Sequence, residues 1–389
     1  MDHVDGFTPA EYADRTARVR HGLREQGVDV AVVLAPDSQF WLCGLESFIS
    51  GVLTQALIVP AADDSETVLL MWDADLPIAH DTARSDRILS YRFGVDDPVA
   101  LIGAEVRAAV GTSAVVGLDA GSRAVPHSLG LRLRDALAPA SVVDCSGLLG
   151  QARQVKSAAE LDCLRRAGAF ASLGLDAAAE HARPGITERQ LAAEIEYAMR
   201  RAGSDYPSIP TELSSGRRSA QVHATPSHRV LEAGDLVHVE IGGVERRYNA
   251  VGLQTLHVGG AAAPVRGRHL YDVARACLEA GLDAARPGTP AADVEAPALE
   301  LLRKHGVGDG FAMRFGYGVG AGYPPTWLDP FAITRTSADV LLPGTAFVLH
   351  ACLLDEQAEV GVLVGGAYAM TEHGLEMLSG AGPVDLVTT

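Results

Sequence analysis

The sequence predicts a two-domain α+β protein, with a smaller α/β domain over residues 1–152 and a larger α+β domain over residues 153–389. Three observations support this prediction. The length of 389 residues suggests more than one domain, since domains commonly hold about 100–200 residues. The first part of the chain alternates helical and strand-like segments, and the second part contains an internal repeat.

The first domain begins with apolar positions at helical spacing over residues 11–27, and this segment ends on a glycine. Short runs rich in β-branched and other apolar residues then predict buried strands. A helical stretch at 97–110 lies between two of them, which is the pattern of a sheet covered by helices. The predicted strands are 28–35, 56–60, 66–72 and 114–120.

The second domain begins with a long predicted helix over residues 154–182, with Ser157 as its N-cap and Glu160 three residues later. The segment 182–203 then recurs as 285–306. Each copy has an Ala-Arg-Pro-Gly start, a threonine and an amphipathic helix closed by a glycine, which predicts two similar α+β halves that form a cleft. Strands are predicted at 236–243, 246–259, 346–354 and 360–371, and a structured loop at 314–327, which is rich in glycine and proline.

Composition excludes several classes of partner. The net charge of −17 repels phosphate backbones and anionic lipid, so we expect neither nucleic acid nor membrane partners. The five cysteines are scattered and form no CxxC pair, which is typical of reduced thiols in a cytoplasmic protein. The sequence has no HExxH motif, no phosphate-binding loop and no GxSxG elbow, so it predicts no cofactor and no metal by spacing.

Glu240 is the main candidate for chemistry. In the predicted strand 236–243, Leu236, His238 and Glu240 share one face, because side chains alternate along a strand. A carboxylate in such an apolar strand is costly to bury without a partner. Glu240 therefore either faces a functional cleft, lies on an edge strand in water, or pairs with an arginine in the core.

Histidines and a tyrosine are the other candidates. His223 and His228 lie in a polar loop, where a histidine is either solvated or a general acid/base. His350 lies in an otherwise apolar strand and is either a core histidine with its hydrogen bonds satisfied or a site residue. Tyr317 lies in a glycine-rich segment and serves either packing or the site.

Several segments resemble one known family. Residues 204–259 resemble the central block of creatinase-like proteins, and 314–327 resemble the GYxxGxxYPPxW signature of the ectoine hydrolase-like subgroup. Residues 153–168 and 36–44 resemble its linker helix and its N-terminal domain. The chain is thereby identified as a member of the creatinase and aminopeptidase P ("pita-bread") family, in its metal-free subgroup. The resemblance implies a creatinase-type α/β N-terminal domain and a pita-bread C-terminal domain of two pseudo-symmetric halves.

The resemblance also locates the positions at which metallopeptidases of this fold hold two metal ions. In this chain Glu240 replaces the first Asp, Val251 the second Asp, Tyr317 the His and His350 the first Glu, and the second Glu falls within 363–365. Valine, leucine and glycine side chains offer no ligand to a divalent cation. The expected site is therefore free of metal.

By the same resemblance, Glu240 is a nucleophile or activates water, and His223 carries the proton to the leaving nitrogen. The implied reaction is hydrolysis of a C–N bond in a small, cyclic or open-chain, nitrogen-containing metabolite. Creatine itself is disfavoured, because Leu253 and a residue near Leu363 replace the carboxylates that hold its guanidinium. A lyase, isomerase or cyclase, and a catalytically silent binding protein, remain as alternatives.

Further residues are predicted to line the site or the subunit contact. The family forms homodimers in which one N-terminal domain lies near the partner's cleft, so a homodimer is expected, with Trp41 and Phe48 as candidate contacts if they are not core residues. The partner expected at the site is a small-molecule substrate. The residues predicted to bind it are His238, Tyr248, Tyr317, Tyr323 and His350.

Overall fold

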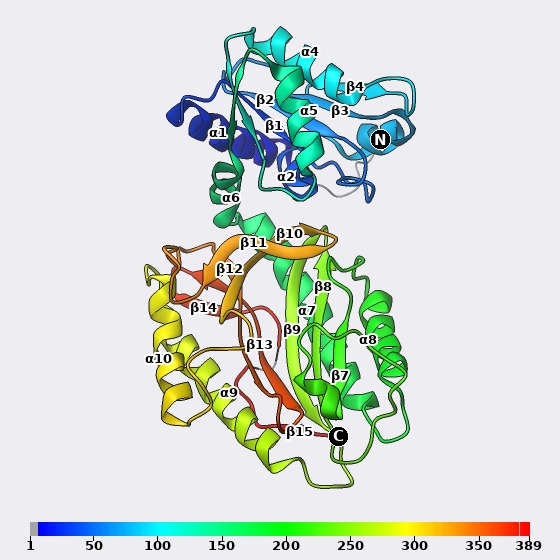
Figure 1. Cartoon of the computed structure of the whole chain (residues 1–389), viewed down its shortest axis with the longest axis vertical. Helices are drawn as coiled ribbons and strands as arrows, with labels where there is room; N and C mark the ends of the chain where they lie inside the picture. The colour runs from blue at the N-terminus through cyan, green and yellow to red at the C-terminus, as the bar shows by residue number, and fades with distance from the viewer. Residues whose placement is uncertain (1–6, 381) are drawn as a thin grey trace. The chain divides into compact units, whose positions relative to one another are not determined.

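The computed structural model describes residues 7–380 and 382–389, and it divides the chain into two compact units. The first unit ends at Arg153 and the second is Gln154–Thr389. Each unit has its own sheet and its own core (Figure 1). Within the described residues, no helix is long and apolar enough to cross a bilayer.

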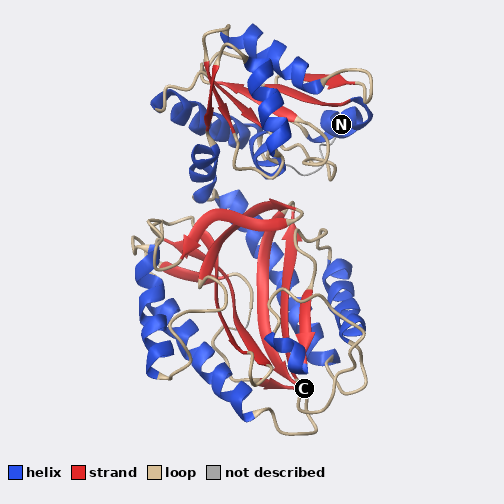
Figure 2. Ribbon diagram, in the orientation of Figure 1, coloured by secondary structure: helices blue, strands red, loops and turns tan. Residues whose placement is uncertain are grey.

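The first unit is a six-stranded mixed sheet with helices on both faces (Figure 2). The strand order is β4-β3-β2-β1-β5-β6, with β1–β2 and β2–β3 antiparallel and the other pairs parallel. The strands are β1 (Val30–Val33), β2 (Ala56–Pro60), β3 (Val68–Trp72), β4 (Arg87–Tyr91), β5 (Val115–Leu118) and β6 (Ser141–Asp144). The helices are α1 (Pro9–Glu25), α2 (Pro36–Cys43), α3 (Leu76–Thr82), α4 (Pro98–Val110), α5 (His127–Leu137) and α6 (Ser146–Gln154).

Alternation along β1 divides the apolar side chains of this unit between two cores. Ala31 and Val33 pack with α1, α2 and α6, whereas Val30 and Val32 pack with α4 and α5 on the other face. Trp41 belongs to the first core and is 1% exposed, so packing within its own unit accounts for it. Phe48 is 77% exposed.

The second unit contains one large curved sheet with the order β11-β10-β12-β13-β9-β8-β7, and β14 and β15 are added at its sides. Its helices are α7 (Ala158–His181), α8 (Glu188–Ala202), α9 (Val265–Ala284) and α10 (Ala291–Lys304). Its strands are β7 (Glu212–Ser215), β8 (Leu236–Glu245), β9 (Tyr248–His257), β10 (Gly316–Tyr323), β11 (Thr326–Ile333), β12 (Ala346–Asp355), β13 (Val360–Thr371), β14 (Gly374–Met377) and β15 (Val387–Thr388).

The internal repeat is visible in the hydrogen bonds of the two halves. Gly185, in the first copy, donates to Leu231, and Gly288, at the same place in the second copy, donates to Leu341. Both glycines have positive φ, at 93° and 84°, which suits a residue without a Cβ. The pita-bread prediction is thus confirmed, with α7 and α8 packed on the β8–β9 hairpin and α9 and α10 packed on the β12–β13 hairpin.

The prediction of a loop at 314–327 is wrong, because this segment forms β10 and the start of β11. The glycines that suggested a loop instead allow close packing of the two strands. A Cβ at Gly318 would lie 2.8 Å from the Cβ of Phe331, and one at Gly322 would lie 2.9 Å from the Cα of Trp327. Glycine within a strand can mark a place where another backbone approaches closely, so it need not indicate a loop.

Candidate active site

The candidate site lies on the face of the large sheet opposite its helices. Val237, Val239 and Ile241 of β8 pack with α7 and α8, so His238 and Glu240 point to the other side. In β12, Leu349 and Ala351 pack against α9 and α10, so His350 also points away from the helices. We call this side of the sheet the site face.

Strand register gathers the candidate residues into one row. Glu212 of β7 is paired with Glu240, Glu240 with Leu253 of β9, Leu253 with Gly365 of β13, and Gly365 with His350 of β12. Directly paired residues in antiparallel strands project to the same face. The row therefore crosses five strands and joins both halves of the unit.

Tyr317 links two members of this row, Glu240 and His350. Its hydroxyl donates a hydrogen bond to Oε1 of Glu240 at 2.9 Å. Its ring lies 5.6 Å from the ring of His350, centroid to centroid, in an edge-on arrangement. The indole N–H of Trp327 donates in turn to the Tyr317 hydroxyl, so the tyrosine proton is directed toward Glu240. Burial, together with the charge of Glu240, raises the pKa of Tyr317, which keeps the phenol protonated.

A glycine makes room for this arrangement. Gly242 is two residues beyond Glu240 on the site face, and a Cβ there would lie 2.8 Å from Cζ3 of Trp327. The indole therefore packs directly against the backbone of β8. Sequence reasoning did not single out Trp327, although its place in the YPPxW signature was a usable signal.

Glu240 is buried, with 5% of its surface exposed, and burial raises its pKa to about 7, an effect that the Tyr317 hydrogen bond partly offsets. Among the described residues no arginine, lysine or histidine forms an ion pair with it. This environment argues against the two alternatives, water and a core arginine, and the functional role of Glu240 stays a prediction.

Glu212 was missed by sequence reasoning and lies directly opposite Glu240. Burial raises its pKa to about 8, and the charge of Glu240 adds to the effect. Cys352 is two residues beyond His350 in β12 and so shares its face, and burial first, and then the two carboxylates, raise the pKa of its thiol to about 12. The alternation of Glu212 with Leu213 in the segment Thr-Glu-Leu-Ser-Ser was the available signal.

The histidines of the site differ in environment. His350 is fully buried, and neither of its ring nitrogens has a hydrogen-bond partner within the described residues. Burial, with smaller effects from Arg314 and His223, lowers its pKa to about 3. Nε2 of His238 lies 3.0 Å from the Ser214 hydroxyl, and burial lowers its pKa to about 4. Both rings are therefore neutral at neutral pH.

His223 lies on the exposed loop after β7, with φ of 57°, and its charge acts on both His238 and His350. The role of His223 at the site stays a prediction. His228, in the same loop, is held by the guanidinium of Arg189, with 2.8 Å between their nitrogens.

One of the two remaining predicted binding residues, Tyr248, lies elsewhere, and the assignment of Tyr323 stays a prediction. Tyr248 is on the opposite face of the sheet, where its hydroxyl donates to Glu160 of α7 at 2.6 Å, so it does not belong to the site face and its assignment is corrected. Tyr323 lies 5.0 Å from the guanidinium of Arg247, a contact that involves no residue of the row. Tyr248 directly follows the two-residue turn at Arg246 and Arg247, and its pairing with Glu245 turns its side chain toward the helices.

The positions that resemblance assigns to metal ligands do meet on the site face. Val251 pairs with Gly242 and therefore lies beside Glu240, and Tyr317 and His350 complete the set. Only Glu240 and His350 among these are ordinary ligands for a divalent cation. In the part of the chain that the structure describes, no group of three or more His, Cys, Asp or Glu residues is placed to hold a metal ion. These residues do not fit a dinuclear centre.

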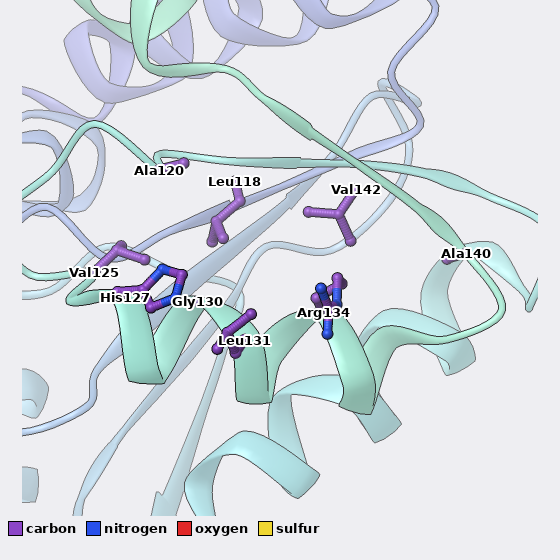
Figure 3. Close-up of a pocket in the computed structure, with 9 residues that line it drawn as sticks. All are labelled: Leu118, Ala120, Val125, His127, Gly130, Leu131, Arg134, Ala140 and Val142. Atoms are coloured by element: carbon purple, nitrogen blue, oxygen red, sulfur yellow. The ribbon is translucent and has the colours of Figure 1, made fainter.

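A pocket of about 490 Å³ lies in the first unit, between α5 and the strands β5 and β6 (Figure 3). His127 and Arg134 of α5 are its polar residues, and the remaining lining is apolar or glycine. It contains no residue of the row, and none of the predicted site residues.

Comparison with known proteins agrees with this architecture. Residues 162–373 match the profile described as Metallopeptidase family M24. The chain belongs to this family. Residues 15–155 match the Creatinase/Prolidase N-terminal domain, so the two-part M24 architecture is complete, and the functional class that comes with the family is hydrolase.

Relatives of this M24 protein include two kinds of enzyme. The ectoine hydrolase of Halomonas elongata is 26% identical over 390 residues, which are 96% of each chain. The Xaa-Pro dipeptidase of Pyrococcus furiosus is 32% identical over 168 residues, 43% of this chain and 48% of that one. The crystal structure of dipeptidase PepE from Mycobacterium ulcerans superposes with a TM-score of 0.85 at 27% identity, covering 99% of each chain.

Proposed function

We propose that this M24 protein is a metal-independent hydrolase that cleaves a C–N bond of a small nitrogen-containing metabolite, cyclic or open-chain. The observation that carries the proposal is the environment of Glu240. Its carboxyl is buried, accepts a hydrogen bond from Tyr317, and forms no ion pair within the described residues. A carboxyl whose pKa is raised to about 7 is suited to proton transfer at neutral pH.

The donor set supports independence from metal. Valine, tyrosine and glycine occupy positions where a metal-dependent relative needs oxygen or imidazole ligands, so the ordinary metal-bound hydroxide has no place to form. The homologous ectoine hydrolase supports a non-peptide substrate. The Xaa-Pro dipeptidase relatives are the reason to test dipeptides beside cyclic amidines and amides.

In the proposed reaction Glu240 either attacks the electrophilic carbon or removes a proton from the attacking water. Tyr317 donates to Oε1 of Glu240 and so leaves the second oxygen for this task. His223, on the exposed loop, shuttles protons to and from solvent. His238 and His350, both neutral at this pH, would contact the substrate through ring nitrogens.

The test is turnover of ectoine, other cyclic amidines, simple amides and Xaa-Pro dipeptides by protein dialysed against chelator. We expect turnover of a non-peptide probe to survive chelation and to fall by about 10²–10⁴-fold in Glu240→Gln and His223→Ala. Matched controls are Glu245→Gln, on the same strand but paired with Arg166, and His228→Ala, in the same loop. Loss of activity on chelation, or cleavage of dipeptides alone, contradicts the proposal.

A second function is favoured by the neutral histidines. Buried His238 and His350 beside a protonatable Glu240 would suit an isomerase, lyase or cyclase, which moves protons without adding water. Products formed in ¹⁸O-water separate the two classes, because a hydrolase places solvent oxygen in its product. We also propose a homodimer as the assembly, and its mass in solution, measured by light scattering, tests this.

A further inference from the structure

The cross-strand pair Glu212–Glu240 is the feature that the family comparison leaves unexplained. Leu213 packs in the core with α7 and α8, so its neighbours Glu212 and Ser214 face the site. Two carboxylates directly opposite each other on one face repel, and burial without a partner adds to the cost. A fold does not need such a pair.

Two other buried carboxylates of this chain have a cation beside them, whereas Asp119 accepts hydrogen bonds from the backbone N–H groups of Leu34 and Ala35. Glu188 accepts hydrogen bonds from Ser215 and Ser227 and pairs with Arg218. Asp329 lies 2.8 Å from Nζ of Lys156. Neither Glu212 nor Glu240 forms an ion pair with any cation in the part of the chain that the structure describes.

The remaining groups around the pair favour one shared proton over a second negative charge. Cys352 and Tyr317 stay protonated because burial raises the pKa of each, and His238 and His350 stay neutral because burial lowers theirs. The charges of Arg218, Arg314 and His223 act on the buried histidines, but within the described residues none of the three forms an ion pair with Glu212 or Glu240. Glu240 is buried and Glu212 is partly buried, and such a carboxyl pair without a paired cation lowers its charge by keeping one proton.

We propose that Glu212 is a second catalytic residue, which shares one proton with Glu240 and acts as the general acid of the reaction. This inference rests on the proposed hydrolase function. Water attacks the carbon of the C–N bond while the Glu240 carboxylate takes one of its protons. As the C–N bond breaks, the Glu212 carboxylic acid gives its proton to the leaving nitrogen. Glu240 then holds the proton and Glu212 is ionised, and one proton passed between them restores the starting state.

The shared proton is tested without a substrate, by NMR titration of protein labelled with ¹³C at the glutamate carboxyl. In the wild type we expect two coupled steps, with one carboxyl of the pair still protonated at pH 7. Glu212→Gln should move the Glu240 titration to lower pH, and Glu240→Gln should move that of Glu212 in the same direction, since coupling is reciprocal. Glu245→Gln is the control and should move neither. Independent titration of the two groups overturns the shared proton.

The acid role is tested on whichever probe the wild type hydrolyses. Glu212→Gln should lower kcat by about 10²–10⁴-fold and abolish the alkaline limb of the pH–rate profile, and Glu212→Asp should restore part of both. For a probe with a better leaving nitrogen, Glu212→Gln should lower kcat by a smaller factor, because that nitrogen needs less protonation to leave.

Unchanged kcat in Glu212→Gln overturns the acid role while the hydrolase function stands. Failure of the wild type on every probe overturns the function and the acid role, while the titration still decides whether a proton is shared. If Glu212→Gln does not fold, Glu212→Asp and the reciprocal Glu240→Gln carry both measurements.

Discussion

Replacing Glu212 by glutamine should stabilise the protein at alkaline pH and leave it unchanged in acid. The amide has nearly the same shape as the carboxyl and carries no charge. In the native protein burial, with a contribution from Glu240, raises the pKa of Glu212 from its ordinary 4.5 to about 8. The native state therefore binds more protons than the unfolded chain between these two values. Stability must fall as the pH rises through this window.

The expected magnitude follows from the same values. Each tenfold change in proton affinity is worth about 1.4 kcal/mol. The full shift of the Glu212 pKa would therefore lower the free energy of unfolding by about 5 kcal/mol above pH 8. Glu212 is only partly buried, and solvent screens part of the repulsion. We expect Glu212→Gln to raise the free energy of unfolding by about 1–3 kcal/mol at pH 9 and to leave it unchanged at pH 4.5.

Urea unfolding at a series of pH values, followed by circular dichroism, measures the difference between variant and wild type. The control Glu245→Gln removes a carboxylate that is paired with Arg166 at the surface, and its effect should not grow with pH. The placement of Glu212 opposite an ionisable Glu240 would be refuted if Glu212→Gln stabilised the protein equally at pH 4.5 and pH 9, or destabilised it at pH 9.

Three further substitutions test the packing around the site. Gly242→Ala should cost about 1–3 kcal/mol in urea unfolding, because its Cβ would lie 2.8 Å from the Trp327 ring. His350→Leu should gain stability at pH 4–5 relative to pH 8, because burial lowers the histidine pKa to about 3 and the wild type loses stability as the pH falls from 6.5 toward 3. Lys156→Met should cost up to about 3–5 kcal/mol, because it removes the buried ammonium that lies 2.8 Å from the carboxylate of Asp329.

Each of these has a matched comparison. Gly147→Ala, in α6 with nothing within 4 Å of the new Cβ, should be neutral or slightly stabilising. His228→Leu, on the exposed loop, should show no acid-dependent gain. Lys304→Met, at the exposed end of α10, should change stability by less than about 0.5 kcal/mol. Equal effects in the test and control variants would contradict the burial on which each prediction depends.

Local patterns predicted much of the fold. The Ser157 and Glu160 capping box starts α7 as expected, because its geometry depends on four consecutive residues. The alternation in residues 236–243 placed His238 and Glu240 on one face for the same reason. The repeat of residues 182–203 predicted the two halves, because each copy must bury one amphipathic helix on its own hairpin.

What sequence reasoning missed depends on contacts between distant strands. Glu212 lies opposite Glu240 only because β7 pairs with β8 in this register. A shift of the register by one residue would turn Glu212 toward the core. Tyr248 is the converse case, since register turns it toward Glu160 and α7. Residues 314–327 were read as a loop from their glycines, whereas those glycines serve strand contacts that only the folded sheet reveals.

The two halves of the second unit supply different chemistry from equivalent places. Glu240 lies six residues after Gly234, and His350 lies six residues after Gly344; these glycines donate to Val258 and Met370 at corresponding points of the two hairpins. At these equivalent places the first half thus contributes the carboxyl of Glu240 and the second contributes the neutral ring of His350. Under the proposed function, such asymmetry suits a substrate with distinct ends.

Tyr317 joins the two halves into a single site. Its hydroxyl donates to Glu240 of the first half, and its ring contacts the ring of His350 in the second. Replacing it by phenylalanine would keep the contact with His350 and remove only the hydrogen bond to Glu240. The pKa of Glu240 should then rise further, because the bond that favours its ionised form is lost. If the same substitution left the Glu240 titration unchanged, Tyr317 would be a packing residue, and the site would reduce to the two carboxyls.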